Sequence, residues 1–256
     1  MPLWASGYRN LLPNRRRMME AGQSSGQSYT NKMLGYNPTT YWIQSETSGT
    51  TAVCQVNTAQ NGTYARNVTT MGTGTGIGDG NTAPDFDGAN DVNNVYSAAL
   101  NTAFDGDEGS ILTWIKVSGA GVWTDSTLRV FFHIQVDVNN YVSLRKPTTN
   151  NLLSMIYRAG GTSKTVSPAY SGTGWTLIGL TWSASADETK AYINGSQVGS
   201  TQTGLGVWSG GALISWGCCV GANTTVPANI WDGLQAHAAI FDSVLSGPEM
   251  SDLASV

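Results

Sequence analysis

Charged residues are scarce in this chain, and that scarcity narrows the classes of protein it can represent. Asp, Glu, Lys and Arg make up 12% of the 256 residues, against about a quarter in an average globular protein. The formal net charge of −4 does not provide the broad basic face that general nucleic acid binding requires. Glycine is abundant at 31 residues, which is typical of short strands joined by polar loops.

Long apolar runs are also missing. The sequence has no run of about 18 apolar residues, so it contains no predicted membrane span. Its N-terminus lacks the apolar stretch of a secretory signal peptide. We therefore expect a protein that is made and folded in a cytosol, without export by the general secretory route.

Cysteines are few and poorly placed for metal binding. Cys54 lies far from the adjacent pair Cys218 and Cys219, and none of them has the Cys-x-x-Cys or Cys/His spacing of a zinc site. The favoured interpretation is that all three are buried free thiols. A single bridge from Cys54 to Cys218 or Cys219 remains the alternative.

Residues 1–40 differ from the rest of the chain because they lack strand alternation. Four of the thirteen basic residues occur within nine positions of this segment. Apolar and aromatic side chains lie close to them, which favours a groove on another protein over nucleic acid as the contact. We predict an N-terminal arm that docks on a partner through Trp4, Tyr8, Arg9, Leu11, Leu12, Arg15, Arg16 and Arg17.

From residue 41 onward the pattern predicts β-strands. Residues 110–117 alternate apolar and polar positions, as half-buried strands do. Asn139-Asn140 and Asn194-Gly195 separate apolar stretches and predict hairpin turns. Near the end, Ser246 and Glu249 form the Ser-x-x-Glu signature of a helix start. The sequence therefore predicts one all-β domain over residues 41–256, a two-sheet antiparallel sandwich closed by a short C-terminal helix.

Several short motifs, in their order, resemble one family. They are Phe86-Asp87-Gly88-Ala89-Asn90-Asp91, Thr113-Trp114-Ile115-Lys116, the run 175–182, Ala191-Tyr192-Ile193-Asn194-Gly195 and the run 231–246. On these motifs, residues 41–253 resemble a laminin-G-like, concanavalin A-like lectin/glucanase jelly roll, of the kind found in bacteriophage virion surface proteins.

The resemblance implies a concave sheet or edge loops that bind glycans, proteins or calcium. It does not imply catalysis. Glycosidases of this fold resemble one another in a Glu-x-Asp-x-x-Glu strand that presents two carboxylates on one face, and no such run occurs here. The nearest acidic cluster, residues 105–108, lies in a turn beside glycine. We therefore expect a protein that is not an enzyme.

Oxygen ligands are densest between residues 79 and 91. Calcium binds carboxylate, amide and carbonyl oxygens, and the candidate calcium ligands are Asp79, Asn81, Asp87 and Asp232. The competing interpretation is that these Asp-Gly and Asn-Asp pairs are ordinary turn residues.

The nine tryptophans are divided between core and surface by their sequence context. Trp42, Trp114, Trp175 and Trp182 lie in apolar strand patterns and are predicted to be core residues. Aromatic residues closer to loops are the candidate glycan contacts: Trp123, Tyr170, Trp208 and Trp231. His133 and His237 lie in strand patterns far from each other and are interpreted as ordinary sheet histidines.

These observations predict a non-enzymatic protein of a virus surface, namely a bacteriophage capsid decoration, fibre or spike component. Its arm would dock on other virion proteins, and its sandwich would face outward as a homo-oligomer that binds glycans. The protein would be made in the host cytoplasm without a signal peptide. Two alternatives are a stand-alone bacterial lectin module and a glycoside hydrolase or lyase with an unrecognised site.

Overall fold

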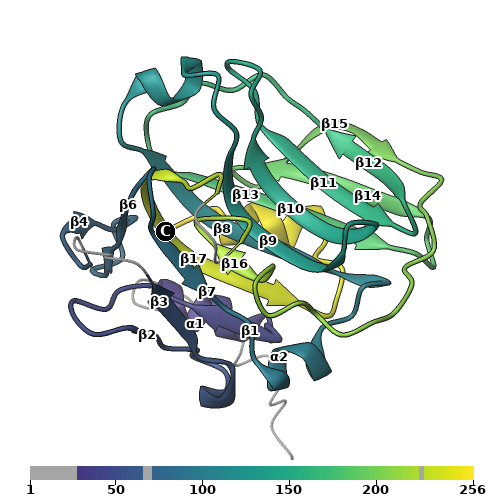
Figure 1. The fold of residues 1–256 in the computed structure, drawn as a ribbon, viewed down its shortest axis with the longest axis horizontal. Helices are drawn as coiled ribbons and strands as arrows, with labels where there is room; N and C mark the ends of the chain where they lie inside the picture. Colours follow the sequence, from purple (N-terminus) through teal and green to yellow (C-terminus); the bar gives the residue numbers. More distant parts are fainter. Residues whose placement is uncertain (1–27, 66–70, 225–227) are drawn as a thin grey trace, which may run out of the picture.

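A computed structural model describes residues 28–65, 71–224 and 228–256, which form a sandwich of two antiparallel β-sheets with three short α-helices (Figure 1). The seven-stranded sheet has the order β1-β17-β8-β13-β14-β15, with β6 also paired to β17. Its strands are β1 (Thr40–Trp42), β6 (Asp85–Asp87), β8 (Glu108–Val117), β13 (Thr176–Ser183), β14 (Glu188–Ile193), β15 (Ser196–Gln202) and β17 (Asp232–Phe241).

The second sheet has eight strands in the order β12-β11-β10-β9-β16-β7-β3-β2. These are β2 (Thr51–Ala52), β3 (Gly62–Ala65), β7 (Val92–Asn94), β9 (Arg129–Asp137), β10 (Asn140–Lys146), β11 (Ser154–Ala159), β12 (Thr162–Val166) and β16 (Cys219–Val220). A separate two-stranded ribbon pairs β4 (Gly74–Thr75) with β5 (Thr82–Ala83). Two short 3-10 helices are η1 (Thr58–Gln60) and η2 (Ala120–Thr124), and one of the three α-helices is α2 (Ala98–Ala103). The predicted all-β sandwich is confirmed.

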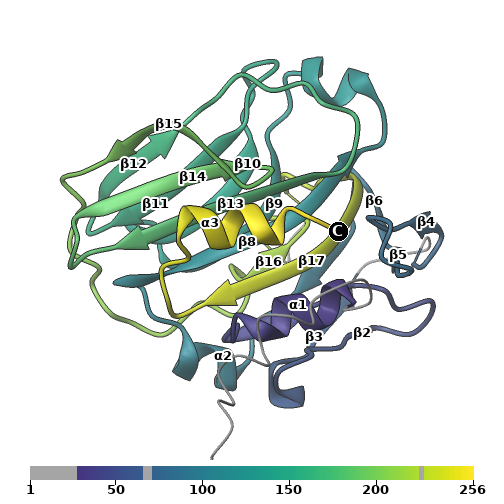
Figure 2. The same ribbon diagram turned by 180° about the vertical axis from the view of Figure 1, so that it is seen from behind.

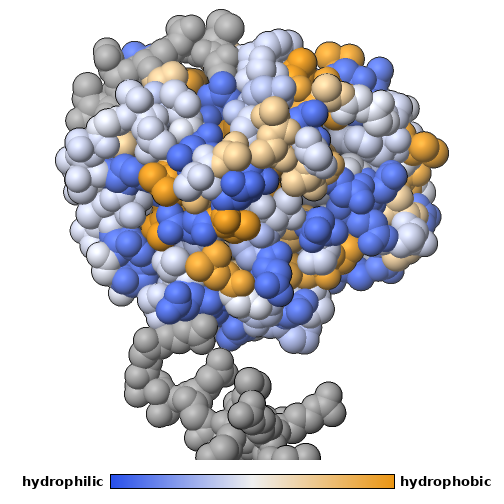
Figure 3. Space-filling model, turned by 90° about the horizontal axis from the view of Figure 1, so that it is seen from below, coloured by the Kyte–Doolittle hydropathy of each residue, from blue (hydrophilic) through white to orange (hydrophobic). Residues whose placement is uncertain are grey.

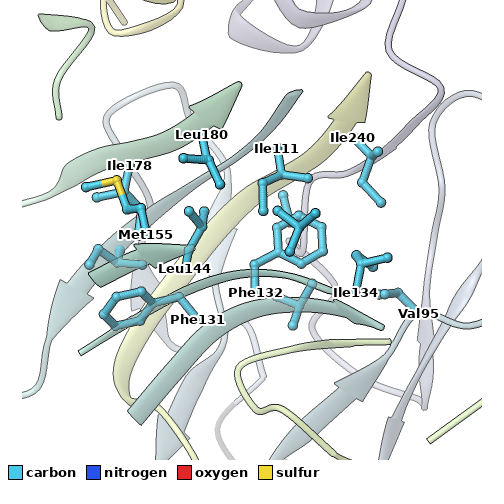
Figure 4. Packing of buried hydrophobic residues seen from close by; sticks show 14 of the residues in the cluster. Val95, Ile111, Phe131, Phe132, Ile134, Leu144, Met155, Ile178, Leu180 and Ile240 are labelled. Carbon is cyan, nitrogen blue, oxygen red and sulfur yellow. The ribbon is translucent and has the colours of Figure 1, made fainter. Parts of the chain in front are cut away.

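The core lies between the two sheets and is built by the inward-facing positions of their strands. Figure 4 shows Ile111, Ile178 and Leu180 from the seven-stranded sheet packing against Phe132 and Leu144 from the eight-stranded sheet. All five side chains are fully buried. Burial of aliphatic and aromatic side chains of this size is worth about 1.5–3 kcal/mol each, so this layer is the main stabilising contact of the fold.

Turn chemistry fixes several strand registers. Asn194 and Gly195 both have positive φ angles, 47° and 76°, and they close the β14–β15 hairpin as predicted. A turn with positive φ at both central residues matches the twist of the strands that it joins, and Asn-Gly adopts it readily. The hairpin predicted at Asn139-Asn140 is also present, but its turn lies one residue earlier, at Val138 and Asn139, because β9 ends at Asp137 and β10 already begins at Asn140.

The outer face of the seven-stranded sheet is covered by α1 (Tyr29–Gly35) and α3 (Gly247–Leu253), which lie in front of it in Figure 2. The Tyr29 hydroxyl donates to the Leu253 carbonyl and accepts from the Trp114 indole, both at 2.8 Å. One phenol therefore joins both helices to β8. Helix α3 begins with the predicted capping box of Ser246 and Glu249.

Helix α1 falls inside the segment that the sequence assigned to a docking arm. Its Tyr29 and Met33 are buried against the sheet. The eight predicted contact residues of the arm, Trp4, Tyr8, Arg9, Leu11, Leu12, Arg15, Arg16 and Arg17, lie outside the described residues.

The cysteines and the predicted core tryptophans are placed largely as expected. Cys54, Cys218 and Cys219 are buried free thiols, and Trp42, Trp114 and Trp182 are buried. Trp175 is only half-buried, at the edge of the α1–α3 layer.

The molecular surface is mixed in character. On the face shown in Figure 3, hydrophobic residues form small separate spots among polar ones. Within the described ranges, no helix is long and apolar enough to cross a membrane.

Candidate functional site: a polar pocket on the eight-stranded sheet

A shallow pocket lies on the outer face of the eight-stranded sheet, over β9 and β10. Side chains alternate between the two faces of a strand, so Tyr141, Ser143 and Arg145 of β10 share the outer face while their neighbours fill the core. In register with them, Gln135 of β9 lies opposite Tyr141, and His133 lies opposite Ser143. Two adjacent strands therefore bring five polar side chains to one patch of surface.

A β-bulge in β9 keeps this arrangement compatible with the core. Phe132 is opposite Leu144 and Val130 is opposite Arg145, so Phe131 has no partner on β10. The extra residue lets both phenylalanines pack inside, where each is fully buried, and leaves Val130 and Arg145 on the outer face. Bulges commonly re-aim side chains in this way near binding sites.

The pocket has a volume of about 210 Å³ and a largely polar wall. Its lining residues are Val130, His133, Gln135, Val138, Tyr141, Ser143, Arg145 and Asn223. None of these is a carboxylate, and Arg145 is the permanently charged group among them. The wall can therefore exchange hydrogen bonds with a polar ligand and offers one cation.

His133 is neutral in this setting. Its side chain is 7% exposed, its Nε2 lies 3.3 Å from the Gln135 Oε1, and its ring lies 5.3 Å from the Tyr141 ring. Burial is the main cause that lowers the pKa of His133 to about 4; the nearby Arg145 charge acts in the same direction, and the Gln135 hydrogen bond opposes both. With Nε2 donating to Gln135, Nδ1 is left as an acceptor.

Several polar atoms of the pocket wall have no hydrogen-bond partner among the described residues. They are Nδ1 of His133, Nε of Arg145 and Oδ1 of Asn223, each inaccessible to solvent. A buried polar atom without a partner costs about 1–3 kcal/mol. A ligand that supplied donors and acceptors here would recover part of that cost.

The segment before β16 packs against Gln135 of the pocket and carries an exposed aromatic residue. The Ile214 amide donates to the Gln135 carbonyl at 2.9 Å. Gly217 packs so closely on Gln135 that an added Cβ would lie 2.9 Å from its Oε1. Trp216, which lies between Ile214 and Gly217 in the chain, is 50% exposed, so the segment that packs on Gln135 carries an exposed aromatic ring.

The four aromatic residues that the sequence nominated as glycan contacts do not form such a surface. Trp231 is fully buried with its ring centroid 4.6 Å from that of Phe131, and Trp123 is 1% exposed. Trp208 is 9% exposed and Tyr170 is half-buried with its ring 5.2 Å from Trp123. A sugar needs an open ring face, so the prediction for the three tryptophans is wrong. They lie in loop-like sequence, but the loops fold inward over the core.

The candidate calcium ligands lie in two pairs and not in one group: Asp79 contacts Asn81, and Asp87 is opposite Asp232 on β6 and β17. Asp79 lies 3.0 Å from Nε2 of His237 and receives a hydrogen bond from the Asn81 amide. Asp232 pairs with Arg129 at 3.3 Å, and Asp87 accepts hydrogen bonds from the two amides of its own turn. Among the described residues, no group of three or more His, Cys, Asp or Glu side chains is placed to hold a metal ion. The turn interpretation of these residues is therefore the one that the structure supports.

The contact of Asp79 with His237 belongs to a buried network beneath α1. The Tyr41 hydroxyl lies 2.5 Å from Nδ1 of His237, and the Tyr29 ring lies 4.7 Å from the imidazole. Burial lowers the pKa of His237 while Asp79 opposes that shift. The His237 side chain is completely covered and Asp79 is 2% exposed, so the network attaches the loop before β5 to β17 and is closed to substrates.

A second hollow, of about 460 Å³, lies in the loop around β4 and β5. Its lining is Thr73, Gly74, Thr75, Gly78, Gly80, Asn81 and Thr82. It contains neither a charged nor an aromatic side chain, so it lacks the groups that would anchor a ligand. The smaller pocket on the eight-stranded sheet is the better candidate site.

Two facing sheets with a polar pocket on the outer face of one of them define a lectin-like sandwich. The sequence matches the concanavalin A-like lectin/glucanases superfamily over residues 87–251. This match covers more than half of the chain, which therefore belongs to that superfamily, and the predicted resemblance is confirmed. The fold occurs in both binding domains and glycosidases. A comparison with curated proteins gave no match.

Solved structures share the fold at low sequence identity. Domain 4 of AbnA, a GH43 extracellular arabinanase from Geobacillus stearothermophilus, in complex with arabinotriose, is 17% identical with a TM-score of 0.61, and the match covers 85% of this chain and 98% of that one. The botulinum neurotoxin serotype D binding domain is 15% identical with a TM-score of 0.60, over 87% of this chain and 52% of that one. The present chain thus spans about half of the toxin fragment.

A third similar structure is the CBM40 of a Ruminococcus gnavus IT-sialidase bound to α2,3-sialyllactose. It is 12% identical with a TM-score of 0.50, over 68% of this chain and 96% of that one. At these identities the likeness establishes the fold alone.

Proposed function

We propose that the protein is a non-enzymatic glycan-binding protein that holds a sugar in the pocket over β9 and β10. The observation that carries the proposal is the wall of that pocket, where His133, Arg145 and Asn223 each present a buried polar atom without a partner. Sugars offer many hydroxyl groups that donate and accept. Two of the similar structures hold oligosaccharides, which supports the same function for this fold member.

The proposal that the protein is not an enzyme is supported by the composition of the pocket wall. Glycoside hydrolysis generally needs two carboxyl groups about 5–10 Å apart beside the scissile bond. No Asp or Glu lines this pocket. The neutral His133 and the guanidinium of Arg145 do not replace the missing acid and nucleophile.

The test is a glycan array probed with the full chain, followed by calorimetric titration of each hit. Tyr141→Ala removes an aromatic wall of the pocket and should weaken binding about tenfold, which corresponds to about 1.4 kcal/mol. Tyr36→Ala is the matched control because Tyr36 lies at the end of α1, on the opposite side of the sandwich. It should leave the affinity unchanged.

Two outcomes would contradict the proposal. One is an array without any bound glycan, in the presence and in the absence of calcium. The other is a Tyr141→Ala variant that binds as well as the native chain. Release of reducing ends from a bound glycan would instead support the hydrolase alternative.

We further propose that the protein works on the surface of a virus particle, as a bacteriophage capsid decoration, fibre or spike component made in the host cytoplasm. Residues 1–40 would dock on other virion proteins, with several copies in the assembly. The basic and aromatic composition of that segment supports the docking role. The position of α1 supports it too, because α1 lies on the seven-stranded sheet, on the side opposite the pocket.

Deletion of residues 1–27 tests this placement. The deletion variant should keep its far-ultraviolet circular dichroism spectrum and its glycan affinity, and it should no longer co-sediment with particles. A variant that still co-sediments would contradict the docking role. A glycan-binding chain that never associates with particles, even at full length, would favour the stand-alone lectin alternative.

A further inference from the structure

Among the described residues, the arginine of the pocket has no counter-ion. Arg129, by comparison, lies 2.8 Å from Asp125 and 3.3 Å from Asp232, and Lys146 lies 2.6 Å from Asp125. None of the ion pairs between described residues involves Arg145. The segments outside the described ranges contain one carboxylate side chain, Glu20.

The setting of Arg145 makes this lack of a partner costly. Arg145 lies in the middle of the sheet, between Val130 of β9 and Ser154 of β11. It is half-buried, and its Nε has no hydrogen-bond partner in the described part of the chain. Burial lowers the pKa of Arg145 from its ordinary value, yet a guanidinium remains protonated in proteins. The pocket therefore carries a partly desolvated positive charge.

A second guanidinium lies on the same face of the sheet. Arg158 of β11 is directly opposite Tyr141, and residues opposite each other in an antiparallel pair share a face. Its two hydrogen bonds to described residues, Ser163 and Asn139, are both long at 3.4 Å, and its Nε has no partner among those residues. Arg158 thus adds positive potential beside the pocket while its own contacts remain weak.

The rest of the wall is neutral and suits a sugar ring better than a bare inorganic anion. His133, Gln135, Ser143 and Asn223 supply hydroxyl, amide and imidazole groups, and Tyr141 supplies a ring. The volume of about 210 Å³ is below the roughly 300–1,000 Å³ of pockets for drug-sized ligands. One monosaccharide unit therefore fits the pocket, with the remainder of a longer glycan left outside.

We propose that this pocket selects an acidic sugar, a pyranose unit whose carboxylate pairs with Arg145 while its hydroxyl groups bond to His133 and Asn223. This inference rests on the proposed glycan-binding function and names its ligand class. A carboxylate matches the planar fork of a guanidinium, and such charge-assisted pairs are about twice as strong as neutral hydrogen bonds. Arg158 strengthens the attraction at longer range.

The experiment is calorimetric titration of the full chain with matched sugars. The acidic probes are trigalacturonate and sialyllactose, and their neutral counterparts are a galactose trisaccharide and lactose. A sulfated galactose trisaccharide provides a third arm. At least one carboxylated probe should bind tenfold or more tightly than its neutral counterpart, and its affinity should fall when salt is raised from about 0.1 M to about 1 M, because salt screens partly exposed charges.

The variants are Arg145→Gln, Arg145→Lys and the control Lys190→Gln. Arg145→Gln should reduce the affinity for the carboxylated probe at least tenfold, and Arg145→Lys should restore part of it. Lys190→Gln removes the same charge from β14, on the other sheet, and should bind as the native chain does. The thermal midpoint of each variant verifies that it is folded, and the comparison of acidic with neutral sugars needs no variant.

Each result decides between the hypotheses. Equal affinity for acidic and neutral sugars overturns the acidic ligand and leaves the glycan-binding function standing. Preference for the sulfated probe alone overturns the choice of a carboxylate. Acidic binding that Arg145→Gln does not weaken places the site elsewhere on the protein. Failure of every sugar on the array and in titration removes the proposed function itself.

Discussion

Asp91 is a buried acid in an unfavourable electrostatic setting. It is 1% exposed, its Oδ2 accepts a hydrogen bond from the Asp87 amide at 3.0 Å, and its Oδ1 has no partner among the described residues. Burial raises the pKa of Asp91 to about 6, and the charges of Asp87 and Asp85 raise it as well, while the amide of Asp87 opposes them. A raised pKa means that the folded state prefers the protonated acid. Protonated Asp91 therefore stabilises the folded state below the unfolded pKa of about 4. That stabilisation is lost as pH rises through the folded pKa of about 6.

Asp91→Asn should therefore stabilise the protein at neutral pH and have little effect at pH 4. The amide keeps an oxygen that can accept from Asp87, and it carries no charge. We expect a thermal midpoint a few degrees higher at pH 7.5, since 1 kcal/mol corresponds to about 2–4 °C in a chain of this size. Thermal unfolding of both proteins from pH 4 to pH 8 checks the sign. A variant that is less stable at pH 7.5 would contradict it.

Alanine variants of Trp216 and Trp231 test where the proposed glycan-binding surface lies. Trp216 is 50% exposed on the segment that packs against Gln135 of the pocket, whereas Trp231 is fully buried. Trp216→Ala should weaken glycan binding about tenfold, or about 1.4 kcal/mol, with an unchanged thermal midpoint. Trp231→Ala should lower the free energy of unfolding by about 3–5 kcal/mol. The hypothesis fails if Trp216→Ala binds glycan normally, or if Trp231→Ala unfolds at the native midpoint.

Sequence patterns predicted the burial of the strand residues Trp42, Trp114 and Trp182, but they did not predict which aromatic rings near loops stay exposed. Trp123 and Trp231 occur in loop-like sequence, and their burial depends on how those loops fold over the core. Arg145 is an ordinary strand residue in sequence. Its proposed role arises because no carboxylate of the described residues forms an ion pair with it, which is a property of the assembled sheet. The alternation of residues 141–145 could have shown that Tyr141 and Arg145 share a face.

Among the elements, α1 is one that the sequence pattern did not predict. It has seven residues and only Tyr29 and Met33 are buried, so it gives too short a repeat for recognition by periodicity. Strands such as β8 and β13 and the hairpin turns were predictable, because their signals are local. The bulge at Phe131 was not, because it depends on the register between β9 and β10.

Helix α1 should contribute measurably to stability. Met33 is fully buried beneath it, and truncation of a buried methionine to alanine costs about 2–5 kcal/mol. Met33→Ala should lower the free energy of unfolding in urea by that amount. Asn31→Ala, an exposed position of the same helix, is the control and should change it by less than about 0.5 kcal/mol. Equal stability of the two variants would mean that α1 is not part of the cooperative unit.

At the scale of the whole molecule, acid should weaken the fold through its buried histidines. Burial holds the pKa of His133 at about 4 in the folded state and lowers that of His237 too, against about 6.5 in the unfolded chain. A lowered histidine pKa stabilises the folded state above about pH 6.5, and that stability is lost as pH falls towards the folded pKa. Asp91 acts in the opposite direction over part of this range.

The His133 contribution can be isolated by substitution. Between pH 7.5 and pH 5 its loss amounts to roughly 1–2 kcal/mol, by the conversion of about 1.4 kcal/mol per pKa unit. The native chain should therefore lose more stability over this interval than His133→Gln does. Urea unfolding of both proteins at the two pH values measures the difference. Parallel pH profiles would show that His133 titrates normally.

The first and last described helices, α1 and α3, lie together on the side of the sandwich that faces away from the pocket (Figures 1 and 2). A chain held by a segment next to either helix would present its pocket towards the medium. Many such chains on one support would form an array of parallel, outward-facing sites. Multivalent attachment can exceed the affinity of a single site by about 100- to 10,000-fold. A small pocket for one sugar, too weak to hold a cell surface alone, would then suffice for firm attachment.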